Sequence, residues 1–311
     1  MSPQVHLGID VGAESGRVMA GLWDGRRMAL AEEARFANRT VEMGGVLRWD
    51  PAGLWSGIRD GLARAGRSHG DRVVSVGADT WGLDYVLLSG SGELLGLPRC
   101  YRDPSHPAAF EAVLERIPRA ELFDRTGIQF MPINTLYQWF AHQSRSPDTL
   151  GAARRFLLMP DWIHHLLCGA ECVEFTNATT TQFFDPRGRS WCIDLLDRLG
   201  LPTGLLPEVV SPGTRLGRLL PRTATATGLT AAEVVAPGTH DTASAVVGIP
   251  TGSTGRPGWA YISSGTWSLV GFESATPRLG PEALALNITN EGGVEGTWRV
   301  LKNVMGLWIL Q

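Results

Sequence analysis

The stretch VHLGIDVGAESGRVMAGLW (residues 5–23) decides how the chain begins to fold. It holds two apolar runs, VHLGID and RVMAGLW, on either side of the short polar loop VGAESG (11–16). A third run, MALAEEARF (28–36), follows the turn Asp24-Gly25. Apolar runs of this length, separated by tight-turn residues, are typical of antiparallel strands. We therefore predict a strand–turn–strand–turn–strand meander over the first 36 residues.

A helix and two further strands are expected after the meander. Asp50 suits an N-cap and Pro51 suits the first helical position. The segment that they open has apolar residues on one face: Leu54, Trp55, Ile58, Leu62 and Ala65. The nearly continuous apolar run DRVVSVGAD (71–79) then predicts a buried strand, and YVLLS (85–89) predicts another after the polar loop 80–84. Strands at both ends of a helix indicate an α/β sheet.

The middle of the chain, from about residue 104 to 200, has mostly helical patterns. We expect helices around 108–117, 135–143, 162–167 and 192–199, the last ended by Gly200. The run VVA (234–236) predicts a strand that leads into polar residues and then into a helix at ASAVVGIP (243–250). WAYISSGTWSLVGFE (259–273) predicts a second strand–turn–strand after the connector 251–258. We place a domain boundary near residue 249, which gives domains 1–249 and 250–311.

The composition is that of an ordinary globular protein, with 43% hydrophobic and 19% charged residues. A net charge of −3 provides no basic field, so we expect neither nucleic acid nor a membrane surface as a partner. No apolar run reaches the roughly 20 residues that span a bilayer, and the first residues lack a signal-peptide pattern, so we expect a cytoplasmic protein. No obligate protein partner is indicated. The four cysteines are expected to be reduced and structural: Cys100, Cys168, Cys172 and Cys192.

Missing motifs count against several classes of enzyme. Lys302 is the single lysine of the chain, so a Walker phosphate-binding loop has no lysine and Schiff-base chemistry is not expected. The patterns G-x-S-x-G, H-E-x-x-H and G-x-G-x-x-G are absent. His164 and His165 are adjacent on a predicted helix, where consecutive side chains point about 100° apart. We therefore interpret this histidine pair as structural.

The loop after the first strand has the composition of a phosphate-binding hairpin. Its small residues allow backbone N–H groups to approach an anion, Ser15 adds a hydroxyl donor, and Arg17 adds positive charge. Asp10, at the strand end, could hold a hydrated Mg²⁺ beside phosphates. Glu14 would repel a phosphate, so we expect its carboxylate to point elsewhere. An ordinary glycine-containing turn is the alternative interpretation.

The same frame occurs a second time. Residues 9–15 and 262–268 share the pattern I-x-x-G-x-x-S, each on a predicted strand–turn–strand. Three matched positions are little evidence by themselves. Both turns are small and rich in hydrogen-bond donors, however, and this supports a two-domain design with related polar turns.

A second polar cluster, Thr239-His240-Asp241-Thr242, follows the strand predicted at 234–236. The carboxyl ends of strands in α/β folds are common positions for active sites. An aspartate there can accept a proton from a substrate hydroxyl while its neighbours orient the substrate. The alternative is that Asp241 caps the helix that follows.

Ten segments, spread in order along the chain, together resemble one family. They are GIDVGAESGRV, GADTWGLDYVLL, YRDP, TGIQFMPINTLYQ, LLMPDW, TNATTTQ, THDTASAV, YISSGTWSLVGFES, ALNITNEGGVEG and VLKNVMGLW. The sequence resembles the FGGY carbohydrate kinases, and among them those that act on L-rhamnulose. The resemblance implies an α/β, two-lobed fold of the ribonuclease H-like and actin-like ATPase type. It also implies that sugar and ATP bind between the lobes.

The resemblance further implies a reaction and a set of site residues. The reaction is transfer of a phosphoryl group from ATP, with Mg²⁺, to O1 of L-rhamnulose in rhamnose catabolism. Asp241 resembles the base that accepts the proton of that hydroxyl. The residues that resemble sugar-contacting positions are Gly82, His240, Asp241, Thr242 and Asn303. The residues that resemble nucleotide-contacting positions are Ala13, Glu14, Ser15, Gly16, Arg17, Thr266 and Gln311.

Members of the family continue beyond the position that matches Gln311, so we expect the second lobe, begun at residue 250, to be incomplete in this chain. The apolar residues 307–310 are expected to begin a buried helix. Two alternatives stay open. One is a kinase for another ketose, such as fuculose or xylulose, and the other is a catalytically incomplete sugar-binding remnant.

Overall fold

The predicted meander forms half of a six-stranded sheet. The computed structural model of the chain describes residues 3–256 and 258–310. The sheet has the strand order β13-β14-β6-β1-β2-β3, and β1, β2 and β3 pair antiparallel as expected. β6 pairs parallel to both β1 and β14. The bounds are β1 (Gln4–Val11), β2 (Ser15–Trp23), β3 (Met28–Ala37), β6 (Val73–Thr80), β13 (Arg215–Arg218) and β14 (Glu233–Val235).

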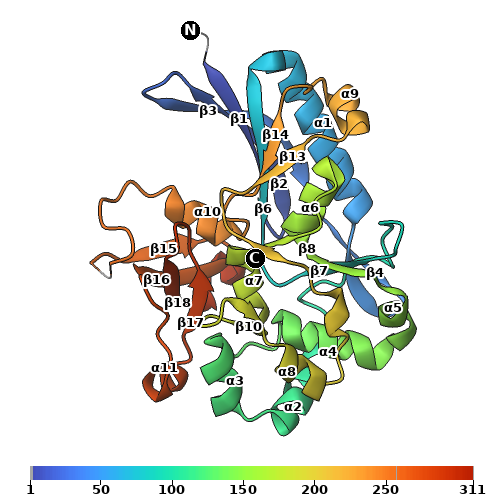
Figure 1. Cartoon of the computed structure of the whole chain (residues 1–311), viewed down its shortest axis with the longest axis vertical. Helices are drawn as coiled ribbons and strands as arrows, with labels where there is room; N and C mark the ends of the chain where they lie inside the picture. Colours follow the sequence, from blue (N-terminus) through green and yellow to red (C-terminus); the bar gives the residue numbers. More distant parts are fainter. Residues whose placement is uncertain (1–2, 257, 311) are drawn as a thin grey trace.

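The predicted helix after the meander is α1 (Pro51–His69), which lies along the sheet (Figure 1). Asp50 is its N-cap and accepts a hydrogen bond from the backbone N–H of Gly53 at 2.9 Å. The predicted apolar face of α1 packs against β2 and β3, although Trp55 on that face is only partly buried. Its buried members are Leu54, Ile58, Leu62 and Ala65. The helix α9 (Pro221–Thr227) packs beside α1.

The middle of the chain is helical, as predicted, and contains more elements than the periodicity indicated. Four expected helices are present as α2 (His106–Arg116), α4 (Thr135–Arg145), α6 (Met159–Cys168) and α8 (Ile193–Arg198). Sequence analysis missed α3 (Arg119–Thr126), α5 (Pro147–Ala152) and α7 (Phe175–Ala178), which are too short to show a clear period. Short 3₁₀ turns are η2 (Thr179–Thr181) in this region, η3 (Thr203–Leu205) just after it, and η1 (Gly70–Arg72) between α1 and β6.

Short strand pairs join the helices to the sheet. Their bounds are β4 (Thr40–Met43) with β5 (Val46–Trp49), β7 (Tyr85–Leu88) with β8 (Arg155–Leu158), β9 (Val173–Glu174) with β12 (Val209–Val210), and β10 (Phe184–Asp185) with β11 (Ser190–Trp191). The pairs β4–β5 and β10–β11 are local, whereas β7–β8 and β9–β12 join strands that are distant in sequence. No local pattern specifies such pairs, because their pairing depends on the packing around them.

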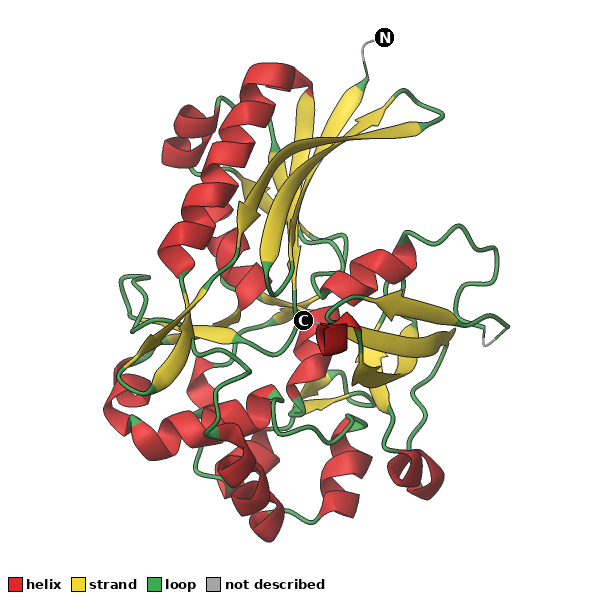
Figure 2. Cartoon of the chain, turned by 180° about the vertical axis from the view of Figure 1, so that it is seen from behind, coloured by secondary structure: helices red, strands yellow, loops and turns green. Residues whose placement is uncertain are grey.

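The last part of the chain forms a second, four-stranded sheet. Its order is β15-β16-β18-β17, and the predicted strand–turn–strand at 259–273 is its β15–β16 hairpin. It lies beside the end of the first sheet in Figures 1 and 2. The bounds are β15 (Tyr261–Ser264), β16 (Trp267–Ser274), β17 (Thr289–Gly292) and β18 (Trp298–Met305), with α10 (Asp241–Val247) and α11 (Pro281–Leu286).

Two expectations about smaller features had different outcomes. Residues Leu307–Leu310 form a 3₁₀ turn, η4, rather than a buried helix, and Leu307 and Ile309 are more than half exposed. All four cysteines are free, as expected. Within residues 3–256 and 258–310, no helix is long and apolar enough to cross a membrane.

Amide side chains join the second sheet to the loop between α3 and α4. Gln129 mimics a neighbouring strand: its Oε1 accepts from the backbone N–H of Asn303 at 2.8 Å, and its Nε2 donates to the carbonyl of the same residue at 3.2 Å. Asn290 Nδ2 donates to the carbonyl of Gly127 at 2.8 Å. The loop that carries Gln129 is therefore held against β17 and β18.

The close approach of α1 and α9 generates a stability prediction. A Cβ atom on Gly66 would lie 1.8 Å from the carbonyl oxygen of Thr227, so the two helices would have to separate. We expect Gly66→Ala to lower the free energy of unfolding by about 2 kcal/mol, although alanine favours a helix. Urea unfolding followed by tryptophan fluorescence measures this change.

Gly151 provides the matched control for Gly66. It lies in α5, and a Cβ atom on Gly151 would have no heavy atom of another residue within 4 Å beyond its neighbours in the helix. We expect Gly151→Ala to leave the unfolding free energy unchanged or to raise it by up to about 1 kcal/mol. Equal stability of the two variants would contradict the packing argument.

Candidate active site

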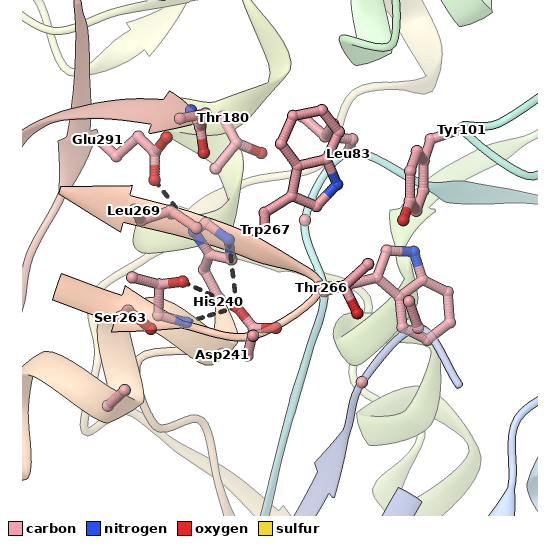
Figure 3. Close-up of a pocket in the computed structure, with 18 of the residues that line it drawn as sticks. Leu83, Tyr101, Thr180, His240, Asp241, Ser263, Thr266, Trp267, Leu269 and Glu291 are labelled. Carbon is pink, nitrogen blue, oxygen red and sulfur yellow. Dashed lines mark hydrogen bonds and ion pairs between the residues drawn. The ribbon is translucent and has the colours of Figure 1, made fainter. Parts of the chain in front are cut away.

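A cavity of about 720 Å³ lies where the carboxyl ends of β1 and β6 meet the second sheet. Figure 3 shows part of its lining. Most of the residues proposed from the sequence line it: Asp10, Ala13, Glu14, Ser15, Arg17, Gly82, His240, Asp241, Thr242, Thr266 and Asn303. Residues that are more than 200 positions apart in sequence are thus brought to one cavity.

Gly16 is placed differently from these residues. Gly16 is buried in β2 and does not line the cavity; a Cβ there would lie 2.3 Å from the ring of Phe36. The small size of Gly16 therefore allows Phe36 to pack against it. Gly16 presents no face to the cavity for the expected contact with nucleotide. Gln311 lies outside the described residues.

The two segments with the I-x-x-G-x-x-S pattern form turns on the same cavity. In the first, the N–H of Gly12 donates to the carbonyl of Ser15 at 2.9 Å, and Asn38 Nδ2 donates to the carbonyl of Gly12 at 2.9 Å. In the second, the N–H of Gly265 donates to the carbonyl of Trp267 at 2.8 Å. Glu14 also lines the cavity, within electrostatic reach of Arg102.

Asp241 is the first residue of α10, and the N-cap position belongs to His240. The capping alternative for Asp241 is therefore not what the structure shows. Its Oδ1 accepts from the backbone N–H of Thr242 at 2.5 Å and from the hydroxyl of Thr242 at 3.1 Å, and His240 Nε2 lies 3.4 Å away. None of the described residues donates a hydrogen bond to Oδ2. That oxygen is available to a ligand.

The surroundings of Asp241 act on its protonation in opposite directions. Removal from water raises the pKa of Asp241, and the carboxylate of Asp10 adds to this effect. His240 and the hydrogen bonds from Thr242 lower it. The side chain remains 38% exposed to the cavity. A carboxyl group with a raised pKa and an open oxygen is suited to accept a proton.

Asp79 is a cavity residue that sequence analysis missed. It lies opposite Asp10 in the parallel register of β1 and β6. Burial raises the pKa of Asp79 well above its usual value, and the charges of Asp10 and Asp241 raise it further. Its place at the carboxyl end of a predicted strand was a usable signal, because parallel strands end at the same edge of a sheet.

The donor set suits a hydrated cation better than a directly coordinated one. Within the described residues, no group of three or more His, Cys, Asp or Glu side chains is arranged to hold a metal ion. Arg17 Nε donates to Asp10 Oδ2 at 2.8 Å. Mg²⁺ commonly keeps several waters and is held by one or two carboxylates together with phosphates. The position of Asp10 on the cavity fits contact through water.

The wall formed by Trp81, Gly82 and Leu83 is fixed from behind by Asp84, which is 1% exposed. Its Oδ2 accepts from the indole N–H of Trp81 at 3.0 Å and from the backbone N–H of Tyr101 at 3.2 Å. Further donors are Trp49 Nε1 to Oδ2 and Gln138 Nε2 to Oδ1. Sequence analysis did not single out this residue. One carboxyl group thus joins two aromatic cavity residues to the core.

Comparisons with known protein families agree with this geometry. Residues 5–248 match the N-terminal domain of the FGGY family of carbohydrate kinases, and residues 260–311 match its C-terminal domain. The chain belongs to this family. The prediction made from the ten sequence segments is confirmed.

Curated relatives and solved structures extend the comparison. The chain is 44% identical over 307 residues to the rhamnulokinase of Pectobacterium atrosepticum, covering 98% of this chain and 60% of that protein. It is 40% identical over 305 residues to the rhamnulokinase of Halalkalibacterium halodurans, covering 64% of that protein. A crystal structure of ligand-bound xylulose kinase from Lactobacillus acidophilus superimposes with a TM-score of 0.85 at 15% identity, over 97% of this chain and 60% of that one. The two-lobed α/β fold class is confirmed.

The chain therefore spans about 60% of the length of the curated relatives that it matches. The similarity to xylulose kinase shows a shared fold, because the identity is only 15%. The similarity to the rhamnulokinases is much greater in sequence and extends over almost all of this chain.

The buried carboxyl group of Asp84 generates a pH prediction. Burial raises the pKa of Asp84 to about 6, against the hydrogen bonds that lower it. Because the folded pKa lies above the unfolded value of 3.8, the native state favours the protonated form and loses stability as pH rises through about 6. The stability of the parent chain relative to Asp84→Asn should fall by about 2 kcal/mol between pH 4 and pH 7.

Urea unfolding of both proteins across this pH range measures the effect, since other titrating groups cancel in the difference. Asp60→Asn is the control, because the Asp60 side chain is 69% exposed on α1. Its difference from the parent chain should not change with pH. A rise with pH in the stability of the parent chain relative to Asp84→Asn would refute the argument.

Proposed function

We propose that the protein containing this chain transfers a phosphoryl group from ATP to O1 of L-rhamnulose, giving ADP and L-rhamnulose 1-phosphate. The observation that carries the proposal is the 40–44% identity to rhamnulokinases over 98% of the chain, with Asp241 placed in the cavity between two donor-rich turns. We place this reaction in rhamnose catabolism in the cytoplasm, where free cysteines are common.

Asp241 is the general base in this proposal. Its Oδ2 takes the proton of the O1 hydroxyl as the O1–P bond forms and the bond between the β- and γ-phosphates breaks. Oδ1 is held by Thr242 and faces His240, so the carboxyl group keeps one orientation during the transfer. Phosphoryl transfer depends mainly on positioning and charge stabilisation, so no lysine nucleophile or phosphate-binding lysine is needed.

The remaining site residues divide between the two substrates. Gly82, His240, Thr242 and Asn303 contact the sugar in this proposal. Ala13, Glu14, Ser15, Arg17, Thr266 and Gln311 contact the nucleotide, and Mg²⁺, when bound, offsets phosphate charge near Asp10 through water. The first domain, residues 1–249, supplies the sugar site and the first phosphate turn, and residues 250–311 begin the ATP-binding domain.

The apolar part of the cavity suits the proposed sugar. Leu83, Ile128 and Leu269 line the same cavity as Asp241. L-Rhamnulose ends in a methyl group, which loses contact with water favourably against such side chains. L-Fuculose has the same methyl group, whereas a pentulose such as xylulose lacks it. Relative kcat/KM values for these three ketoses decide the sugar, because differences in apolar contact are measured in that ratio.

Replacement of Asp241 tests the mechanism. We expect Asp241→Asn to lower sugar-dependent ADP formation by about 10³-fold or more, because asparagine cannot accept the hydroxyl proton. Sugar affinity by calorimetry should change by less than about fivefold, since the amide keeps the size and most hydrogen bonds of the carboxyl group. A coupled ADP assay with ATP, Mg²⁺ and L-rhamnulose measures the loss, beside a reaction without sugar.

Asp60→Asn serves as the control for general effects of removing a carboxylate. Undiminished turnover in Asp241→Asn would remove this residue as the base. Calorimetric binding of L-rhamnulose without any ADP formation by the parent chain would instead support the sugar-binding alternative.

A further inference from the structure

The guanidinium group of Arg299 is a positive charge buried completely beside the proposed base. Arg299 lies in β18 and is 0% exposed. Burial of a charge is costly unless the group is paired and hydrogen-bonded. Its Nε donates to the carbonyl of Gly292 at 2.9 Å, and its Nη2 lies 3.2 Å from Glu291 Oε2 and 3.1 Å from His240 Nδ1. The guanidinium therefore contacts the imidazole that faces Asp241.

The imidazole of His240 is held in one place between the two lobes. Its backbone N–H donates to Thr176 Oγ1 at 3.2 Å, and the residue forms a parallel bridge with Thr80 at the end of β6. Its Nδ1 points to Glu291 and Arg299 from the second sheet, and its Nε2 points to Asp241. Figure 3 shows His240 between Glu291 and Asp241.

The neighbours of Nδ1 favour opposite protonation states. A guanidinium group can only donate hydrogen bonds, so Arg299 requires an unprotonated Nδ1, and the ring proton is then on Nε2. Glu291 can only accept when ionised, so it favours a proton on Nδ1. Glu291 Oε2 lies 3.2 Å from Nδ1 but has hydrogen-bond geometry with none of the described residues, whereas the contact of Arg299 has that geometry. The geometry thus favours Arg299 as the partner of Nδ1.

We propose that Arg299 is a positioning residue that holds His240 as the tautomer protonated on Nε2, by donating from Nη2 to Nδ1 while neutralising Glu291. The proton on Nε2 then faces Oδ1 of Asp241, and Oδ2 stays free for the sugar hydroxyl. Without Arg299, Nδ1 would donate to Glu291 and a lone pair on Nε2 would face the carboxylate. The catalytic part of this inference rests on the proposed function, whereas the tautomer does not.

Other charges surround Asp241 without replacing this contact. Asp10 and Asp79 lie at the ends of β1 and β6, and Arg17 on β2 pairs with Asp10. They change the potential at Asp241, but among the described residues only Glu291 and Arg299 contact Nδ1 of His240 as charged partners. Control of the tautomer therefore comes from the second sheet.

Nitrogen NMR of the histidine rings tests the tautomer directly in the 311-residue chain. The chain contains seven histidines, and His240→Gln assigns the signals of His240. His164 is an internal reference, because its Nε2 accepts from the backbone N–H of Ala78 at 3.0 Å and its proton must lie on Nδ1. Burial lowers the pKa of His164 to about 3, so that ring stays neutral at about pH 7.

We expect opposite patterns for the two rings: His240 protonated on Nε2 and His164 protonated on Nδ1. In Arg299→Met the proton of His240 should move to Nδ1, while His164 does not change. A parent His240 that is protonated on Nδ1, or on both nitrogens, would overturn the proposal. An unchanged pattern in Arg299→Met would do the same.

Kinetics test whether the tautomer matters for the reaction. Because Nδ1 of His240 becomes the hydrogen-bond partner of Glu291 in Arg299→Met, the buried carboxylate keeps one partner, and this single variant is used for the kinetics. We expect its kcat to fall by at least about tenfold while the Kd for L-rhamnulose changes by less than about threefold. Arg299→Lys, which keeps the charge and one donor, should recover part of kcat.

Arg99→Met is the matched control, because Arg99 is also buried, at 5% exposure, and does not line the cavity. It should lower stability without changing kcat. Unchanged kcat in folded Arg299→Met would overturn the positioning role. If the 311-residue chain turns over none of the ketoses, this chain does not itself carry out the proposed reaction, and the NMR comparison still decides the role of Arg299 in setting the tautomer.

Discussion

The parallel pairing of β6 with both β1 and β14 is the constraint on which the rest of the site depends. Parallel strands end at the same edge of a sheet, and here each end is followed by a functional segment. β1 leads into the turn at residues 12–15, β6 carries Asp79 near its end and leads into the wall at residues 81–83, and β14 leads into His240 and Asp241. Backbone hydrogen bonds join these ends, from Thr80 N to Thr239 O and from Trp81 N to Val11 O. A shift of register in β6 would therefore move every part of the site at once.

This arrangement brings the carboxyl groups of Asp10, Asp79 and Asp241 together on one cavity, where their negative charges repel one another. The pKa of Asp79 rises because burial and the charges of Asp10 and Asp241 all oppose its ionisation. Arg17 offsets the charge of Asp10, and the hydrogen bonds from Thr242 stabilise the carboxylate of Asp241. A site in which these negative charges are only partly offset attracts a cation and the proton of a hydroxyl group, and it disfavours a free anion. Phosphate groups consequently need the donor-rich turns and an accompanying cation, which is the combination that phosphoryl transfer uses.

Local sequence signals predicted the elements that depend on local chemistry. The meander, the capped helix α1 and the two turns follow from alternating apolar runs, Asp50 with Pro51, and glycine placement. Asp84 and Arg299 could not be found in this way, because each is defined by partners far away in sequence: Asp84 by Trp49 and Gln138, and Arg299 by His240. A charged residue in an apolar strand was the available signal for Arg299, since such a residue is rarely buried without a partner. Gly16 does not line the cavity for the related reason that Phe36, which is distant in sequence, packs over it.

The second sheet lines the cavity beside His240 as well as at the turn formed by residues 264–266. Glu291 and Asn303 line the cavity from β17 and β18, and Arg299 reaches His240 from the same strands. Gln129, from the loop between α3 and α4, bonds to both backbone groups of Asn303, so this sugar wall and the second sheet form one hydrogen-bonded unit. Movement of one sheet relative to the other would then change the distance between Asp241 and the wall formed by Glu291 and Asn303. It would also change the contact of Arg299 with His240, which sets the position of the proton on that ring. The proposed base, Asp241, therefore depends on contacts from both lobes, and its protonation depends on how closely the two lobes approach each other.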